Sequence, residues 1–301
     1  TVSSALIGCI IGGAISGLLS SRLGRKRSLI LAACLFFVSA LGSAWPETLF
    51  FTKDQPTMGL LAMFNFYRII GGIGVGLASA VVPMYIGEIA PASIRGRMVS
   101  FNQFAIIFGM LVVYFVNWGI AKGETIEWIN DIGWRYMFAS EAIPAGLFGV
   151  LLLLVPETPR YLALTYRDDQ ALSVLTKING AERAKSILEE IKQSVQKSVS
   201  SKLFSYGKKV IIIGILLSVF QQFVGINVVL YYAPRIFESM GVAKDASMLQ
   251  TIVMGCVNVV FTVLAIMTVD KWGRRTLLIT GSLGMAIGVV AIPTLSYYDI
   301  I

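Results

Sequence analysis

Residues 221–234 read Gln221-Gln222-Phe223-Val224-Gly225-Ile226-Asn227-Val228-Val229-Leu230-Tyr231-Tyr232-Ala233-Pro234, inside an apolar segment that runs from about 210 to 236. Side-chain amides at membrane depth cost free energy unless something pairs with them. Amides and a tyrosine hydroxyl match the hydroxyl groups of an uncharged polyol. Such groups also form hydrogen bonds between neighbouring helices. Three amides and Tyr231 around one glycine favour a ligand site over that alternative.

Apolar segments of this length recur along the chain, which has 301 residues, 56% of them hydrophobic and 14% charged. A membrane-spanning helix needs roughly 17–25 apolar residues. Eight segments qualify, at about 2–20, 29–50, 60–86, 97–121, 134–155, 209–236, 247–269 and 276–298. The sequence therefore predicts an all-α integral membrane protein.

The positive charge follows the loops between these segments. Lys and Arg gather in alternate loops, at 21–28, 87–96, 156–208 and 270–275. Cytoplasmic loops are rich in these residues, so the net charge of +8 reflects topology, and we expect no nucleic-acid partner.

Several classes of catalytic site are excluded or unsupported. The chain has no histidine, which excludes a His–metal site and a His-based triad. The glycine-rich run 71–76 follows no strand and precedes no Gly-Lys-Ser/Thr, so it is not expected to bind phosphate. Glycines spaced four apart favour close helix packing instead, at Gly8 and Gly12, Gly13 and Gly17, and Gly72 and Gly76. We expect no enzyme activity, no cofactor and no metal.

The longest polar interval divides the chain. We expect a membrane bundle at 1–157 with five spans, a cytoplasmic helical linker at 158–208, and a second membrane region at 209–301 with three spans. The linker contains two amphipathic helical patterns. Asn179-Gly180 is a plausible end for the first, and the second runs from about 181 to 199.

Several motifs together carry a family resemblance. They are Arg22-Leu23-Gly24-Arg25-Lys26, its counterpart Asp270-Lys271-Trp272-Gly273-Arg274-Arg275, Glu88 with Arg95-Gly96-Arg97, Gly133-Trp134-Arg135, Pro156-Glu157-Thr158-Pro159-Arg160, and 221–231. With them the chain resembles the sugar porters of the major facilitator superfamily, above all the bacterial proton–xylose symporters. The similarity extends over the whole chain.

The resemblance implies a fold of twelve spans in two six-helix bundles. By motif position this chain resembles spans two to nine, which implies a fragment with eight of the twelve. Ser21 stands where the second-half loop has Asp270, and Met110 stands where xylose symporters have glutamine. The first departure concerns the cytoplasmic charges and the second concerns the identity of the sugar.

The resemblance places a sugar site on three spans. Its residues would be Gln103, Gln221, Gln222, Asn227, Tyr231 and Asn258. At roughly 100° per residue, Gln221, Gln222 and Asn227 spread over about 220° of a straight helix. They can face one small ligand only if the helix is distorted, so we predict a break near Gly225, where glycine permits it.

Two ionisable residues lie within predicted spans. Arg68 and Glu141 each lie some 10–12 Å from the outer end of their spans, at roughly 1.5 Å per residue. Equal depth lets the two charges compensate each other, either as a structural ion pair or as a proton-coupling site. By resemblance, an aspartate on the family's first span lies beside Arg68, and uniporters usually have an apolar residue in place of Glu141.

The remaining charged motif residues lie at the cytoplasmic ends of spans. By resemblance they form a gate of ion pairs that favours the outward-facing state, and they are Glu88, Arg95, Glu157, Arg160, Asp270, Arg274 and Arg275.

These expectations converge on one function. The resemblance implies a proton-coupled monosaccharide symporter for a xylose-like pentose or a hexose, which works by alternating access in the bacterial inner membrane. The alternatives are a facilitative uniporter and a non-transporting sugar receptor. The expected partners are a monosaccharide, a proton and the lipid bilayer, with the protein a monomer.

Overall fold

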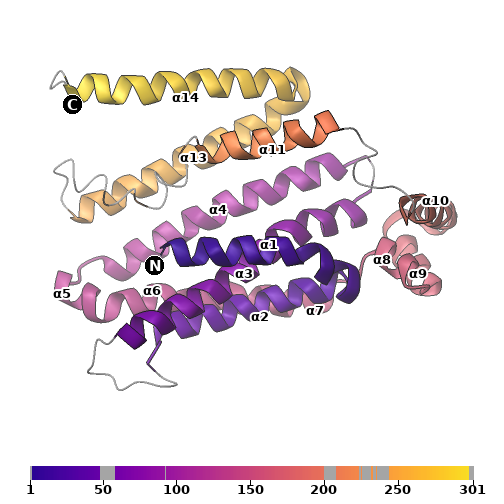
Figure 1. Ribbon diagram of the computed structural model, residues 1–301, viewed down its shortest axis with the longest axis horizontal. Helices are drawn as coiled ribbons and strands as arrows, with labels where there is room; N and C mark the ends of the chain where they lie inside the picture. Colours follow the sequence, from indigo (N-terminus) through magenta and orange to yellow (C-terminus); the bar gives the residue numbers. More distant parts are fainter. Residues whose placement is uncertain are drawn as a thin grey trace.

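The computed structural model describes residues 2–47, 58–91, 93–199, 208–223, 225, 232, 235 and 244–297, and the regular elements in these ranges are all helices. The long helices lie roughly side by side (Figure 1). Their bounds are α1 Val2–Leu23, α2 Arg25–Ala44, α3 Met58–Ile89, α4 Arg95–Ala121, α11 Lys208–Phe223, α13 Lys244–Trp272 and α14 Arg274–Tyr297.

Six helical stretches in the described residues are long and apolar enough to cross a membrane. They are Ser3–Leu23, Arg25–Ala44, Met58–Ile89, Arg95–Ala121, Ile126–Leu154 and Met248–Thr268. Each coincides with a predicted span. The two other predicted spans coincide with α14 and with α11, which is described as a helix to Phe223.

Two predicted boundaries are wrong, and proline accounts for one of them. The segment 29–50 is observed as a helix that ends at Ala44, with Trp45 outside it. Pro46 follows, and the residue before a proline is disfavoured in the α region. The predicted span 134–155 begins earlier, with α5 (Ile126–Trp128) and a π-helix (Ile129–Gly133) ahead of α6 (Trp134–Ser140) and α7 (Ala142–Leu154).

Glycines bring α1 and α3 into backbone contact. A Cβ added at Gly72 would lie 2.1 Å from the Ala5 carbonyl oxygen, and one at Gly12 would lie 2.1 Å from that of Ile73. Gly8 and Gly76 meet backbone atoms at 2.2 Å in the same way. Close packing is therefore confirmed at Gly8, Gly12, Gly72 and Gly76. At Gly13 the backbone nitrogen also belongs to this contact, 2.6 Å from a Cβ added at Gly76, although a Cβ on Gly13 itself would meet nothing within 4 Å. At Gly17 the prediction is wrong for the described structure, since an added Cβ would meet nothing within 4 Å.

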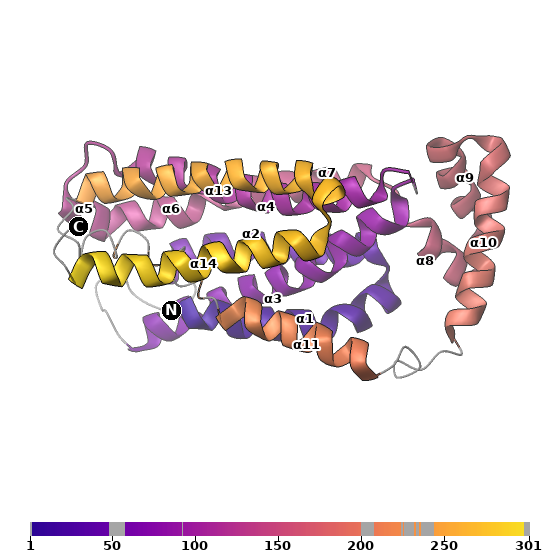
Figure 2. The same cartoon turned by 90° about the horizontal axis from the view of Figure 1, so that it is seen from above.

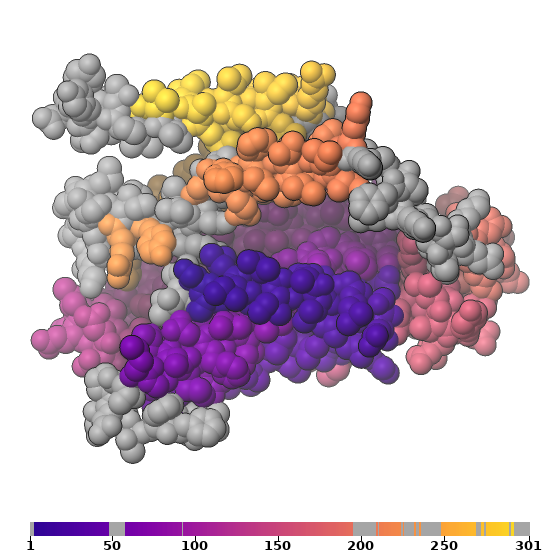
Figure 3. All heavy atoms as spheres, in the orientation of Figure 1, coloured from indigo at the N-terminus to yellow at the C-terminus, as the bar shows by residue number. Residues whose placement is uncertain are grey.

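The apolar core of the N-terminal half joins α2, α3 and α7. Its buried residues are Leu29, Ala32, Ala33, Leu77, Val81 and Leu152. Farther along the chain, α13 packs on α4, and a Cβ at Gly255 would lie 3.0 Å from the side chains of Leu111 and Tyr114. A view turned by 90° shows α13 running beside α4 (Figure 2). In the space-filling view a hollow separates α1 from α11 (Figure 3).

Three helices follow α7 and lie beyond the end of the long helices (Figures 1 and 2). They are α8 Pro159–Leu164, α9 Asp168–Asn179 and α10 Ala181–Val199. The range 181–199 and the stop at Gly180, with φ +81, are as predicted. The short α8 was not predicted. Thr158 caps it by accepting from the Tyr161 N–H, and Pro159 fits its first turn. The three helices share a small apolar core that includes Leu162, Leu175 and Leu188.

Candidate functional site

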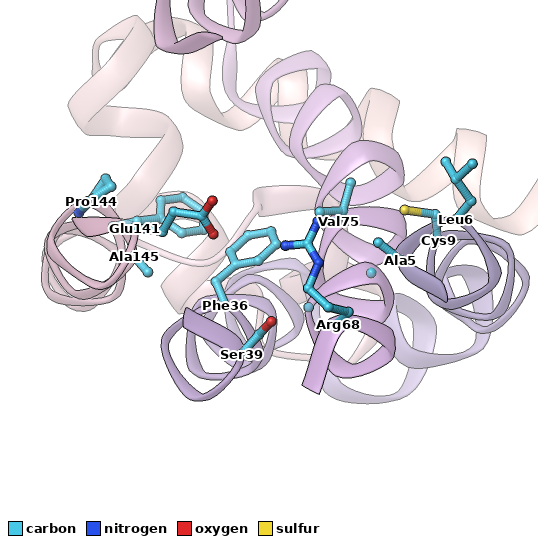
Figure 4. A pocket seen from close by; sticks show the side chains of 13 residues that line it. Ala5, Leu6, Cys9, Phe36, Ser39, Arg68, Val75, Glu141, Pro144 and Ala145 are labelled. Atoms are coloured by element: carbon cyan, nitrogen blue, oxygen red, sulfur yellow. The ribbon is translucent and has the colours of Figure 1, made fainter. Parts of the chain in front are cut away.

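A cavity of about 530 Å³ lies among α1, α2, α3 and α7. Its walls are mainly apolar, and its polar side chains are Cys9, Ser39, Arg68 and Glu141. Figure 4 shows Arg68 and Glu141 approaching the cavity from different helices, with the Phe36 ring between them in that view. Two ionisable side chains thus line a mainly apolar chamber within the membrane-spanning helices.

Arg68 and Glu141 line the same cavity, as their equal depth predicted, but they form no direct ion pair in this structure. Arg68 is half-buried, while the Glu141 side chain is exposed to the chamber. The structure therefore shows a shared cavity without the ion pair that was one of the two predicted alternatives.

The Arg68 guanidinium instead lies over an aromatic ring. Its Cζ atom is 5.3 Å from the centroid of the Phe138 ring, which is within cation–π range. Phe138 belongs to α6, the helix that precedes Glu141. One span therefore carries both the ring that contacts Arg68 and the carboxylate that faces the chamber.

Glu141 occupies an interruption between two helices. The helix α6 ends at Ser140, and α7 begins at Ala142. Pro144 has no N–H to donate to the carbonyl of Ser140, which weakens the helix there. The Glu141 backbone N–H donates to Phe138 O at 3.2 Å, and its carbonyl accepts from Ala145 N at 3.2 Å. The carboxylate thus projects from a local break that proline explains.

A second polar site, which we call the Arg25 cluster, consists of Arg25, Glu88, Glu157 and Tyr161. The Arg25 guanidinium pairs with Glu88 at 2.8 Å and lies 5.6 Å from the centroid of the Tyr161 ring. The Glu157 carboxylate accepts from the backbone N–H groups of Arg25 at 3.1 Å and of Lys26 at 3.1 Å. Glu157 therefore caps the start of α2, where a carboxylate satisfies free N–H groups and the helix dipole.

Gly24 is required where α1 turns into α2. Its φ of +90° lies in the region that favours glycine. A Cβ there would also lie 2.4 Å from Glu157 Oε2 and 2.7 Å from the Tyr161 ring. The Gly-Arg-Lys motif thus has two physical reasons for its glycine.

The predicted gate is assembled only in part. Glu88 and Glu157 meet through Arg25, whereas Arg95, Arg160 and Arg275 form no ion pair with any side chain that the structure describes. Arg95 and Arg275 are exposed. The side chains of Asp270 and Arg274 lie outside the described side chains.

The predicted sugar-site residues are distributed over three helices. Gln103 is exposed on α4, Asn258 is half-buried on α13, and Gln221 and Gln222 are exposed at the end of α11. Asn227 and Tyr231 lie outside the described residues. The predicted break near Gly225 is confirmed: α11 ends at Phe223, and Gly225 has φ +78 and donates its N–H to Gln222 O at 3.1 Å.

Three features of the site region escaped the sequence reasoning: Arg25, Phe138 and one ion pair. Arg25 was grouped with loop charges, although Gly24 beside it signals a special turn. No local sequence pattern singled out Phe138, because its contact with Arg68 depends on the packing of a different helix. The ion pair between Glu47 and Arg135 joins the turn after α2 to the start of α6, and the Arg135 guanidinium also donates to Ala44 O at 3.1 Å. In the described residues, no group of three or more His, Cys, Asp or Glu side chains is placed to hold a metal ion.

Comparison with known proteins assigns the chain to a protein family. The family model described as "Sugar (and other) transporter" matches residues 1–299. The chain belongs to the sugar transporter family. Among its relatives are the D-xylose-proton symporter of Escherichia coli (strain K12), 56% identical over 305 residues, and the arabinose-proton symporter of Bacillus subtilis (strain 168), 41% identical over 303 residues.

A solved structure of a sugar transporter places the helices in a known fold. The xylose transporter XylE from E. coli, in a partially occluded inward-open conformation, matches with a TM-score of 0.88 and 54% identity, covering 99% of this chain and 68% of that one. The helices described above are thus part of the major facilitator fold, as predicted. The chain spans 62% of the length of the E. coli symporter and 63% of the B. subtilis symporter, while 98% and 99% of this chain is covered.

Proposed function

We propose that the full-length protein carrying this chain is a proton-coupled monosaccharide symporter of the bacterial cell membrane that works by alternating access. The observation that carries the proposal is the chamber shared by Glu141 and Arg68 within apolar helices. A carboxylate there can take up and release a proton as the distance to a cation changes. The names of the two symporter relatives support the same chemistry.

The sugar is proposed to bind among Gln103, Gln221, Gln222, Asn227, Tyr231 and Asn258. Neutral amides suit a neutral polyol, because a formal charge would be desolvated for little return. A site that hydrogen-bonds hydroxyl groups also rejects analogues that lack them. The names of the relatives favour a pentose such as xylose or arabinose, with a hexose as the second class.

We further propose the division of labour along the chain. Residues 1–157 and 209–301 contribute to two bundles that rock about the sugar, and 158–208 connects them on the cytoplasmic side. The Arg25 cluster, with Arg95, Arg160, Asp270, Arg274 and Arg275, favours the state in which the cytoplasmic side is closed. The protein acts as a monomer, without a cofactor and without catalysing a covalent change in the sugar.

Transport assays with the full-length protein in liposomes separate this proposal from its alternatives. Xylose and arabinose counterflow distinguishes a transporter from a receptor, which would bind sugar without exchanging it. An imposed inward pH gradient then distinguishes symport from uniport. We expect accumulation above the external concentration with the gradient and only equilibration without it. Equilibration under both conditions would identify a uniporter.

A further inference from the structure

We infer that Phe138 is a positioning residue for proton coupling, whose ring holds the Arg68 guanidinium away from Glu141 so that Glu141 can be protonated. The inference rests on the proposed symport. It starts from the contact of Arg68 with the Phe138 ring, at 5.3 Å, and from the lack of an ion pair between Arg68 and Glu141 in the same chamber.

The Phe138 ring is fixed by two other rings. Phe64 on α3 meets it edge-on with centroids 5.5 Å apart, and Trp134 on α6 meets it at 6.3 Å. Phe64 and Trp134 also contact each other at 6.2 Å. Phe64 lies one helical turn before Arg68, and Trp134 lies one turn before Phe138, so the three rings join the two helices beside the guanidinium. The ring that receives Arg68 is therefore held in a defined place.

The same span offers Arg68 a second partner. Glu141 follows Phe138 by three residues, which in a helix is about one turn along the same face. The contact between a guanidinium and a ring is weaker than an ion pair, because the ring carries no net charge. A guanidinium beside a carboxylate instead favours the ionised form of the acid. Arg68 can thus exchange the ring for the carboxylate when Glu141 loses its proton.

Few other groups compete for this exchange. On the chamber wall α1 contributes the Cys9 thiol, and α2 contributes only uncharged side chains, among them Ser39. The other arginine of the Phe138 helix is Arg135, which is engaged by Glu47. The charged residues of α4, Arg95 and Arg97, lie in its first turn, at the cytoplasmic end. Within the described residues, Phe138 is thus the ring in cation–π contact with Arg68, and Glu141 is the carboxylate on the chamber wall.

Removing the Phe138 ring should shift the pH dependence of sugar uptake in one direction, toward acid. Without it, the guanidinium moves toward Glu141 and favours the charged carboxylate, so loading a proton requires a more acidic medium. We expect the pH of half-maximal gradient-driven sugar uptake to fall by about one unit in Phe138→Leu. Phe138→Tyr keeps a ring and is expected to retain the wild-type profile.

The test compares variants of the full-length protein in liposomes. Wild type, Phe138→Leu, Phe138→Tyr and the control Tyr136→Leu are assayed for uptake against external pH and for counterflow at equal pH. Tyr136 lies on the same helix but stacks on Trp128, with centroids 6.2 Å apart. Counterflow shows that a variant is folded, and an acid shift in Phe138→Leu alone supports the inference.

Other outcomes overturn the inference in distinguishable ways. If Phe138→Leu does not fold, Phe64→Leu removes one support of the ring and is expected to give a smaller shift of the same sign. An unshifted profile in the folded variant, or equal shifts in the Leu and Tyr variants, shows that the ring does not position Arg68. If wild type shows no gradient-driven accumulation, the proposed symport fails and the inference falls with it.

Discussion

The Arg25 guanidinium pairs with the Glu88 carboxylate at 2.8 Å and joins the start of α2 to the end of α3. The two side chains are only 9% and 11% exposed, so neither charge is well solvated without the other. Removing one partner of a buried pair leaves an uncompensated charge, which costs about 3–5 kcal/mol. We predict that Glu88→Ala lowers the free energy of unfolding by about this amount, measured as thermal stability in detergent.

The matched control for that measurement is the exposed ion pair of the linker. Asp168 and Lys192 meet at 2.7 Å, but their side chains are 44% and 35% exposed. Asp168→Ala should change the thermal stability far less than Glu88→Ala. Equal losses in the two variants would show that the Arg25 cluster is no more protected from water than the linker surface.

The contact between α1 and α3 depends on glycine at position 72. A methyl group there would lie 2.1 Å from the Ala5 carbonyl oxygen, which belongs to backbone and cannot rotate away. Overpacking of this kind costs about 1–3 kcal/mol. We predict that Gly72→Ala lowers thermal stability in detergent by a corresponding amount. The control is Gly13→Ala, whose added methyl group would have no atom within 4 Å and should be tolerated. A Gly72→Ala variant as stable as wild type would contradict the observed helix contact.

The linker contains a titrating contact outside the membrane. The hydrogen bond from Lys192 to Asp168 raises the pKa of Lys192 above its ordinary value of 10.5. A raised lysine pKa stabilises the folded linker fully below pH 10.5, and the contribution disappears as the pH rises through the folded-state value. We predict that Asp168→Asn lowers the pKa of Lys192 in a lysine-detected NMR titration. An unchanged titration curve would mean that the two side chains do not meet in solution.

Sugar affinity should depend on the amides at the end of α11. We predict that Gln222→Ala weakens xylose binding about 2- to 10-fold, because one hydrogen bond to a neutral hydroxyl contributes about 0.5–1.5 kcal/mol. Isothermal titration calorimetry of the full-length protein provides the measurement. Gln170→Ala, on the exposed surface of α9, is the control and should bind like wild type. Equal affinity in all three proteins would remove Gln222 from the site.

Local sequence patterns predicted the helices well where one physical cause dominated. Apolar length located every described span, and the apolar stripe of 181–199 gave the bounds of α10. Glycine spacing identified the contact at Gly72 but not the lack of one at Gly17, because spacing does not say which face meets a neighbour. Trp45-Pro46 carried a stop signal that the apolar pattern obscured.

The site was predictable in its composition but not in its pairings. Arg68 and Glu141 stood out because charge is rare within spans, and their depths matched. Which partner Arg68 selects depends on the arrangement of Phe64, Trp134 and Phe138, which only tertiary structure brings together. Glu47 and Arg135 are 88 residues apart in sequence, and neither carries a local pattern that indicates the other.

The central claim is that Glu141 couples sugar movement to a proton. Glu141→Gln keeps the shape of the side chain and removes its titration. The decisive measurement is gradient-driven xylose accumulation alongside xylose counterflow, in liposomes that contain the full-length variant. The account predicts that counterflow continues and accumulation is lost. Accumulation that still follows the pH gradient as in wild type would show that Glu141 does not carry the coupling.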